Sequence, residues 1–282
     1  MKNAAVLLIH SPDRKGLVAE VSSCLYRHGA NITHADQHQD RVEGLFFMRV
    51  EWTLEQFDLP AFTSEFTPIA TGLSMKWKLE LMSGTPRVAI FVSQYLHCLG
   101  DLLQRYQSGE LHCTLPLIIS NHPTAEPIAS FYGVPFHHIQ VQGDTRHEAE
   151  EKQLRLLRDN AISVIVLARY MQILSSAFVN EYPSRIINVH HSFLPAFVGA
   201  RPYHAAFHRG VKLIGATSHY VTGQLDDGPI IEQDVVRISH RDQVDDLVRK
   251  GRDLERVVLA RAVSWHLDHR ILSYGNKTVI FD

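Results

Sequence analysis

Short apolar runs alternate with helical stretches through the later two-thirds of the chain, and this alternation limits the possible folds more than any other feature. The runs lie at residues 88–92, 115–120, 136–141, 163–168 and 186–189. Helical patterns, such as those at 98–106 and 147–158, separate them. Strands that are apolar throughout and joined by helices form a parallel sheet covered on both faces. We therefore expect a doubly wound, mostly parallel α/β sheet.

Two later apolar segments, at residues 213–221 and 230–238, follow one another without an intervening helix. Parallel neighbours need a long crossover connection, so we expect these segments to be antiparallel additions at one side of the sheet. Residues 243–267 then repeat apolar side chains at helical spacing. This spacing predicts a long helix that packs on the sheet.

The first part of the chain has a different order of elements. An apolar strand at 4–10 leads through a turn into a helix whose apolar face carries Leu17, Val21, Cys24 and Leu25. The remaining elements are strands at 31–38, 45–52 and 75–81 and a helix, interrupted by Pro60 and Pro68, before the last strand. The order βαββαβ is typical of the ferredoxin-like fold.

A cluster of turn-forming residues at 83–86 separates these two patterns and is the best candidate for a linker. A chain of 282 residues is also the right length for two domains of roughly 150 residues each. We therefore expect one domain over residues 1–84 and a second over residues 85–282.

The composition favours a small-molecule ligand. Lys and Arg total 28 against 30 for Asp and Glu, so no basic surface for nucleic acid or an anionic membrane is expected. The longest apolar stretch, 161–168, is far shorter than the roughly 18 residues of a spanning helix. The three cysteines, Cys24, Cys98 and Cys113, are an odd and widely spaced set, which favours free thiols and a cytoplasmic location.

Asn188 and His190 belong to the densest group of polar residues, at the end of the expected strand 186–189. Alternate residues of a strand point to the same face, so these two side chains lie roughly 6.6 Å apart and can reach one substrate atom. An amide donor and an imidazole together can stabilise an oxyanion and move its proton. A structural, hydrogen-bonded role is the alternative.

A second polar group follows the strand at 213–221, where a Gly- and Pro-rich loop carries Asp226 and Asp227. A simple turn explains this sequence as well. In a functional loop, one carboxylate would orient a histidine or a water molecule and favour the imidazolium form. The histidines and carboxylates of the chain show no recognisable metal-ligand spacing, so no metal is expected.

The segment 188–195 together with Asp226 in 225–231 resembles the Asn, His and Asp set of the folate-dependent formyltransferase family. Over residues 87–282 the chain resembles the hydrolytic, deformylase branch of that family, for example at 167–174 and 199–204. The first domain resembles an ACT domain through 13–17 and 28–32. The fold implied is an N-terminal ferredoxin-like βαββαβ ACT domain followed by a formyltransferase-fold domain with a doubly wound, mostly parallel sheet.

The resemblance implies hydrolysis of 10-formyltetrahydrofolate to formate and tetrahydrofolate, which supplies formate for purine biosynthesis and balances the one-carbon pool. Asn188, His190 and Asp226 would be the catalytic residues, and no metal or redox cofactor would be required. The folate substrate would bind Met171, Gln172, Ile173, Leu174, Val221, Thr222, Gly223, Gln224 and Leu225. The resemblance further implies a homotetramer, with an amino-acid effector bound to the ACT domain near Gly16, Asn31 and Ile32.

The stretch after the first strand of the second domain favours hydrolysis over transfer. Transferases that act on a phosphorylated glycinamide have a Gly-rich loop there, which cradles the phosphate. Here residues 93–99 are bulky and lack glycine, so water is the expected acceptor. His97 has either a direct or a structural role, Arg201 either contacts the folate tail or is solvated, and His219 supports the Asp226 loop.

Two other functions stay open from the sequence alone. One is transfer of the formyl group to an unidentified amine, with the same fold and the same catalytic residues. The other is an amino-acid-binding regulatory protein whose second domain is inert, although all three catalytic residue types are present.

Overall fold

The computed structural model describes residues 3–143, 145–195 and 202–281, and its contacts divide the chain into two units. The first unit holds residues up to 85 together with 268–272 and 279–281. The second holds residues 86–267 and 273–278. The sequence placed the C-terminal segments with the second domain, whereas the structure places part of them with the first unit.

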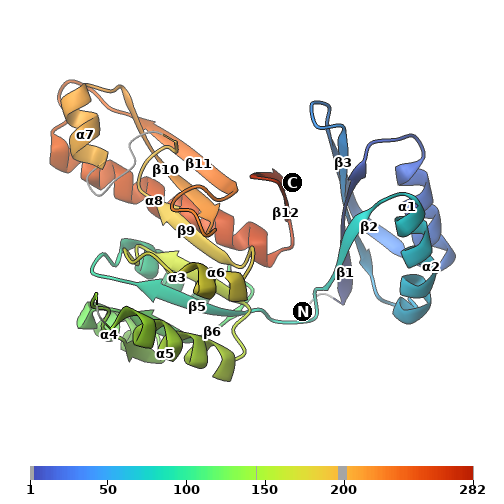
Figure 1. Cartoon of the computed structure of the whole chain (residues 1–282), viewed down its shortest axis with the longest axis horizontal. Helices are drawn as coiled ribbons and strands as arrows, with labels where there is room; N and C mark the ends of the chain where they lie inside the picture. The colour runs from blue at the N-terminus through green and yellow to red at the C-terminus, as the bar shows by residue number, and fades with distance from the viewer. Residues whose placement is uncertain (1–2, 144, 196–201, 282) are drawn as a thin grey trace. The chain divides into compact units, whose positions relative to one another are not determined.

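The first unit has the expected βαββαβ order (Figure 1). Its elements are β1 (Ala4–Pro12), α1 (Leu17–Arg27), β2 (Asn31–Asp40), β3 (Leu45–Thr53), α2 (Leu59–Gly72) and β4 (Lys76–Leu81). The strands are antiparallel in the order β2-β3-β1-β4, which confirms the ferredoxin-like prediction. Ala5, Leu7 and Ile9 of β1 pack with the buried faces of α1 and α2.

Helix α2 is continuous, although Pro60 and Pro68 predicted interruptions. Pro60 lies in the first turn, where a missing N–H leaves no hydrogen bond unmade. Pro68 lies inside the helix and removes one backbone donor, but Phe62, Phe66 and Ala70 on its buried face all pack in the core. This burial offsets the lost hydrogen bond.

The second unit begins with alternating strands and helices. Its elements are β5 (Arg87–Val92), α3 (His97–Gln107), β6 (Thr114–Ser120), η1 (Pro123–Ala125), α4 (Glu126–Phe131), β7 (Phe136–His138), α5 (Arg146–Asp159), β8 (Val164–Ala168), α6 (Ser176–Glu181) and β9 (Ile186–His190). It continues with α7 (Pro202–Arg209), β10 (Leu213–Tyr220), β11 (Ile230–Arg237) and α8 (Val244–Leu267). The last two strands, β12 (Ile271–Tyr274) and β13 (Lys277–Ile280), are divided between the two units. Strand β7 is shorter than expected, and the sequence reading gave no sign of α4, α6, α7 or the β12-β13 pair.

Seven strands of the described chain form one sheet in the order β11-β10-β9-β8-β5-β6-β7. Strands β5 to β9 pair in parallel, and β10 and β11 are antiparallel additions at one edge, as predicted. The carboxyl ends of β5, β8 and β9 therefore lie next to one another. In open α/β sheets this edge is where ligands bind.

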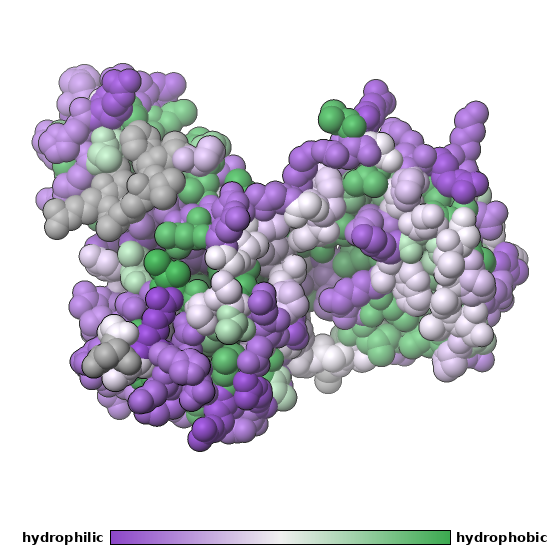
Figure 2. Space-filling view, in the orientation of Figure 1, coloured by the Kyte–Doolittle hydropathy of each residue, from purple (hydrophilic) through white to green (hydrophobic). Residues whose placement is uncertain are grey.

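The surface of the molecule mixes residue types. On the face shown in Figure 2, hydrophilic and hydrophobic residues are interspersed over both units. No helix in the described ranges has the length and apolar character needed to cross a membrane.

Arg49 joins the C-terminal segment to the sheet of the first unit. Its side chain is 4% exposed, on the sheet face opposite the helices. The guanidinium donates hydrogen bonds to the carbonyl oxygens of His269 (3.0 Å) and Asp268 (3.2 Å) and pairs with Glu51 at 2.9 Å. A buried charge with this set of partners fixes the position of residues 268–269 within the first unit.

We expect Arg49→Ala to lower the free energy of unfolding of the first unit by about 2–3 kcal/mol, because it breaks three charge-assisted hydrogen bonds and leaves buried acceptors unpaired. Hydrogen exchange at residues 268–272 should become faster. Urea unfolding and exchange mass spectrometry measure both effects. Arg27→Ala is the control, since its ion pair with Glu65 is exposed and should matter little; equal effects of the two substitutions would contradict the role of Arg49.

Candidate active site

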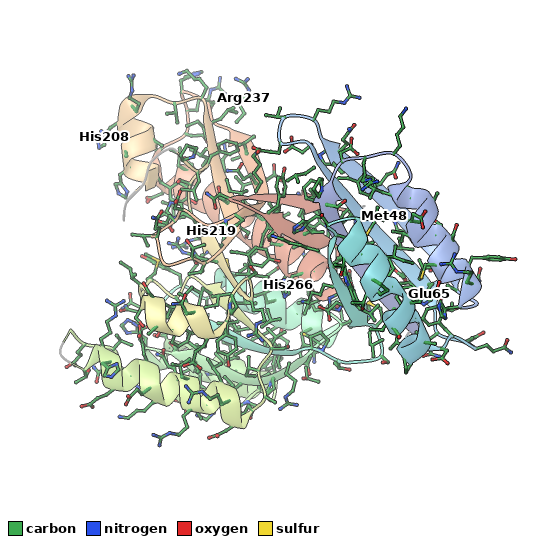
Figure 3. All side chains as sticks on the ribbon, turned by 45° about the vertical axis from the view of Figure 1, so that its right-hand side comes forward. Met48, Glu65, His208, His219, Arg237 and His266 are labelled. Carbon is green, nitrogen blue, oxygen red and sulfur yellow. The ribbon has the colours of Figure 1, made fainter. Side chains whose placement is uncertain are left out.

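Neighbouring strands bring three of the polar side chains together. In the antiparallel pair β9-β10, His190 is opposite Thr217 and Asn188 is opposite His219. Residues directly opposite one another in an antiparallel pair point to the same face. The Asn188 amide nitrogen accordingly lies 3.1 Å from Nε2 of His219. Figure 3 shows His219 among the strands of the second unit, whereas His208 and Arg237 lie at its outer edge.

The loop after β10 brings Asp226 to the two histidines. Oδ2 of Asp226 lies 3.2 Å from Nδ1 of His190, and Oδ1 lies 3.7 Å from Nε2 of His219. Asp226 has a left-handed backbone, with φ of 54°, which few residues other than glycine adopt. A non-glycine residue held in this conformation is typical of a functional site.

Gly228 allows the loop to turn this tightly. A Cβ atom at this position would lie 1.7 Å from the carbonyl oxygen of Tyr220. The amide of Tyr220 donates to the carbonyl of Pro229 at 2.9 Å, so the loop closes directly on the end of β10. Only glycine fits this closure, and the closure sets the position of Asp226.

The site combines one carboxylate with two imidazoles. Hydrogen bonds with His190 and then with His219 hold the pKa of the Asp226 carboxyl well below its ordinary value, although burial acts in the opposite direction. Asp226 is therefore ionised throughout the neutral pH range. Nδ1 of His219 donates to the carbonyl of Tyr220 at 3.0 Å, which turns Nε2 toward Asn188 and Asp226.

His190 has one nitrogen occupied and one available. Its Nδ1 faces Asp226, whereas its buried Nε2 has no hydrogen-bond partner among the described residues. Buried polar atoms are rarely left without a partner, so this nitrogen is a candidate for contact with substrate. Asn188, His190 and Asp226, grouped by the sequence prediction, lie together in the structure, and His219 contacts two of them.

The two expected folate-binding segments converge on the same region. Leu174 and Val221 pack on one core cluster with Tyr170 and Phe178. A Cβ on Gly223 would lie 3.3 Å from the hydroxyl of Ser176, so the Asp226 loop adjoins the start of α6. The remaining segment residues are partly or fully exposed, including Met171, Gln172, Ile173, Thr222, Gln224 and Leu225. Such accessible apolar and backbone groups suit a flat aromatic ligand.

A buried ionic cluster beside the site was not expected from the sequence. Glu255 of α8 is 1% exposed and accepts hydrogen bonds from Tyr203 (2.6 Å) and from Nε2 of His97 (2.7 Å). Nε of Arg169 lies 3.4 Å from the same carboxylate. The only sign of this cluster in the sequence is weak: Glu255 is a single acidic residue on the apolar face of helix 243–267. Arg201, for which the sequence left two roles open, lies outside the residues that the structure describes.

Two groups of side chains place possible metal ligands within 4.8 Å of one another in the described part of the chain. They are Cys24, His28 and Glu65 in the first unit and His97, Cys98 and Glu255 in the second. In each group the histidine and the glutamate already form a hydrogen bond. Neither group includes Asn188, His190 or Asp226.

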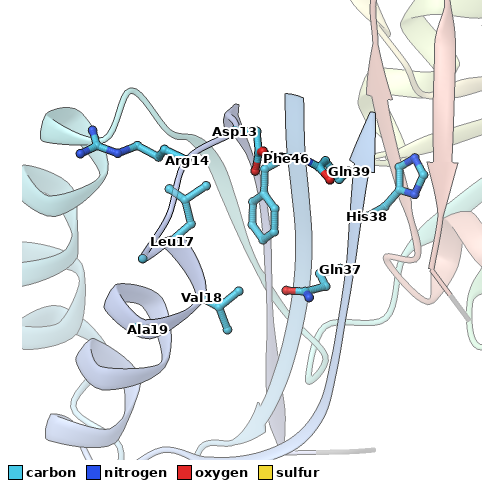
Figure 4. A pocket seen from close by; sticks show the side chains of 10 residues that line it. Asp13, Arg14, Leu17, Val18, Ala19, Gln37, His38, Gln39 and Phe46 are labelled. Carbon is cyan, nitrogen blue, oxygen red and sulfur yellow. Dashed lines mark hydrogen bonds between the residues drawn. The ribbon is translucent and has the colours of Figure 1, made fainter. Parts of the chain in front are cut away.

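A cavity of about 470 Å³ in the first unit lies against the start of α1 (Figure 4). Its lining residues are Asp13, Arg14, Gly16, Leu17, Val18, Ala19, Gln37, His38, Gln39 and Phe46. The cavity thus includes Gly16 of the expected effector site. Asn31 and Ile32, at the start of β2, are not among the residues that line it.

Comparison with known proteins extends over both units. The formyl transferase family matches residues 86–263, and the ACT domain family matches residues 5–58. A protein of Synechocystis sp. named formyltetrahydrofolate deformylase is 54% identical over 98% of both chains.

Solved structures agree with these matches. The crystal structure of a formyltetrahydrofolate deformylase from Pseudomonas syringae pv. tomato is 48% identical, with a TM-score of 0.96 over 100% of this chain and 95% of that one. A glycinamide ribonucleotide transformylase from Symbiobacterium toebii is 27% identical, with a TM-score of 0.67 over 70% of this chain and 95% of that one. The chain is thus similar to both a hydrolase and a transferase in its second unit.

His191 next to the site should make the protein less stable in acid. Burial, followed by the charge of Arg169, lowers the pKa of His191 to about 4. The unfolded chain therefore binds more protons than the folded chain between about pH 4 and 6.5, and stability falls as the pH falls through this range. We expect His191→Gln to reduce the loss of unfolding free energy between pH 7 and pH 5 by about 2 kcal/mol.

Urea unfolding at the two pH values measures this difference. The matched control is His147→Gln, because the side chain of His147 is 86% exposed. Identical pH dependence in the wild type and in His191→Gln would show that His191 is not a buried neutral group.

Proposed function

The chain belongs to the formyltetrahydrofolate deformylase family, and we propose that it hydrolyses 10-formyltetrahydrofolate to formate and tetrahydrofolate, with Asn188, His190 and Asp226 as its catalytic residues. The observation that carries the assignment of roles is the contact of Asp226 with His190, which leaves a buried imidazole nitrogen available beside Asn188. This arrangement suits attack on a formamide carbonyl.

In the proposed reaction, the oxygen of a water molecule attacks the formyl carbon and forms a tetrahedral oxyanion. The Asn188 amide and Nε2 of protonated His190 donate hydrogen bonds to this oxyanion, which are strongest when its charge develops. The bond between the formyl carbon and N10 then breaks, N10 takes one of the two protons of the water, the other is released to solvent, and formate leaves as the anion.

Asp226 acts mainly through its charge in this mechanism. A carboxylate with so low a pKa is a weak proton acceptor, so its main effect is to place a fixed negative charge beside Nδ1 of His190, which orients the ring. Its second oxygen and His219 orient the Asn188 amide and the attacking water. The pterin ring binds between segments 171–174 and 221–225, where backbone groups and apolar side chains are accessible.

The cellular role follows from the products. Formate released by the enzyme supplies purine biosynthesis, and the regenerated tetrahydrofolate balances the one-carbon pool. The three cysteines are free and buried, which supports a cytoplasmic location. A homotetramer remains a prediction, supported by the mostly exposed edge strand β2, which ACT units commonly use to pair.

We propose further that the cavity of the first unit binds an amino acid. Its volume lies within the usual range for small-molecule sites. The backbone N–H groups at the start of α1 and the guanidinium of Arg14 are suited to a carboxylate. The neighbouring Asp13 is suited to the ammonium group of the same ligand.

Replacement of Asp226 by Asn tests the proposed reaction. We expect the rate of formate release to fall by at least about a thousandfold, because the variant loses the negative charge that faces His190 and orients its ring, while folate binding is retained. Formate release is measured without an amine acceptor, and folate binding by fluorescence or calorimetry. Asp227→Asn, a change of the adjacent exposed carboxylate, is the control and should retain activity.

Retention of most activity by Asp226→Asn would contradict the assigned role of Asp226. Labelled formyl that appears on an amine instead of in formate would identify a transferase. The second result requires a parallel reaction with an amine present.

Calorimetric titration of amino acids tests the regulatory site. We expect binding heat with at least one small amino acid, and Arg14→Ala should weaken this binding about tenfold or more, because it removes the cation that faces the carboxylate. Lys15→Ala is the matched control, since Lys15 does not line the cavity. The absence of heat with every amino acid would leave the ACT unit with a role in oligomerisation only.

A further inference from the structure

The buried ionic cluster of His97, Arg169, Tyr203 and Glu255 is not used by the mechanism described above. His97, Arg169 and Tyr203 each have a side-chain atom within 3.4 Å of the Glu255 carboxylate, which is itself almost fully buried. Burial acts to raise the pKa of Glu255, but the hydrogen bond from His97 and the charge of Arg169 together outweigh it. The cluster is thus a fixed, internally paired group.

The cluster lies at the same edge of the sheet as the catalytic residues. His97 begins the helix that follows β5, and Arg169 directly follows β8. The ring of His191 connects the cluster to the site, since its centroid lies 5.0 Å from that of His190 and 6.2 Å from that of Tyr203. The ring of His191 therefore lies between Tyr203 of the cluster and the imidazole of His190.

The cluster and the folate-binding segments lie on different sides of the sheet. Leu174 and Val221 pack with α5 and α6, whose core takes alternate residues of β5 and β8. Helices α3, α7 and α8 carry His97, Tyr203 and Glu255 of the cluster, and α3 and α7 each pack against α8. His191 follows the last residue of β9, and its ring stacks on that of His190 and approaches Tyr203 on the side of the cluster. A second substrate would have to approach the formyl carbon from the side of the cluster.

We propose that this cluster, which includes Arg169 and His97, is the specificity determinant that closes the acceptor side of the site, so that water but not an amine reaches the formyl carbon. This inference rests on the proposed hydrolytic function. The transferase similar in fold to this unit carries in its name an acceptor much larger than water, so the shared fold alone does not exclude amines. In this chain, the cluster lies one histidine ring away from His190.

Arg169 also disfavours amines through its charge. Its side chain is 9% exposed, and its Nε and Nη1 atoms have no hydrogen-bond partner within the described structure. The guanidinium rests against the ring of Tyr95, with 5.5 Å between Cζ and the ring centroid. A buried cation on this side of the sheet disfavours the approach of a protonated amine but not that of a water molecule.

The backbone of Arg169 makes one substitution especially informative. Its φ is 63°, in the left-handed region that glycine adopts without strain. Arg169→Gly therefore removes the guanidinium, opens the acceptor side and relaxes the backbone, while His97 and Tyr203 still bind Glu255. His97→Ala opens the cluster from the other helix and provides an independent variant.

The experiment measures how the formyl group partitions between water and an amine. Full-length protein is incubated with isotope-labelled 10-formyltetrahydrofolate and excess glycinamide, and NMR quantifies formate and N-formylglycinamide. In the transfer reaction the amine nitrogen bonds to the formyl carbon, the bond to N10 breaks, and N10 takes the proton that the amine loses. The product ratio does not depend on the total rate, so it separates specificity from a general loss of activity.

We expect the wild type to give almost only formate, with an amide share close to the detection limit, and Arg169→Gly and His97→Ala to give an amide share at least about tenfold above that limit. Arg252→Ala is the control, because Arg252 stacks on the same Tyr95 ring at 5.4 Å but does not contact Glu255. It should leave the product ratio unchanged. Thermal melting identifies which variants are folded.

Folded Arg169→Gly and His97→Ala variants that still yield formate alone would overturn this inference, and so would a wild type that formylates glycinamide equally well. A wild type that releases no formate would instead contradict the proposed function, and this inference with it.

Discussion

The contact of Asp226 with His190 is the interaction on which the rest of the site depends. It joins the end of β9 to a loop that begins after β10, and both are positioned by the antiparallel pairing of these strands. This contact requires the left-handed backbone of Asp226 and the close approach of Gly228 to Tyr220. The Asp226 carboxylate then orients the rings of His190 and His219, and His219 orients the Asn188 amide.

The two buried carboxylates of the second unit illustrate different uses of the same chemistry. Glu255 has several donors around it and is almost completely removed from solvent, so it is fixed in place. Asp226 is less buried, and its partner His190 keeps a buried nitrogen without a protein partner. The Glu255 carboxylate has its partners within the protein, whereas a substrate would supply the partner of His190 Nε2. The stacked rings of His190 and His191 lie between the two carboxylates.

Much of the fold could be predicted because apolar runs of strand length carry local information. The parallel strands, the antiparallel pair and the long C-terminal helix follow directly from periodicity. Pro68 was misleading because tertiary packing of Phe62, Phe66 and Ala70 outweighs a local preference. Asn188 and His190 share one strand and could be paired from spacing, but Asp226 was assigned only through resemblance to a family. The Glu255 cluster was missed because its members come from distant segments: two helix starts, the end of a strand and the middle of a long helix.

The return of residues 268–272 and 279–281 to the first unit makes that unit discontinuous in sequence. During synthesis, β1 to β4 leave the ribosome long before the segment that pairs with Arg49 exists. The sheet face that carries Val6, Phe47 and Arg49 therefore stays incomplete until nearly the whole chain has been made. A fragment ending at residue 85 would have the same exposed face. Completion of the first unit is thus coupled to completion of the second, and a prematurely terminated chain would contain neither in finished form.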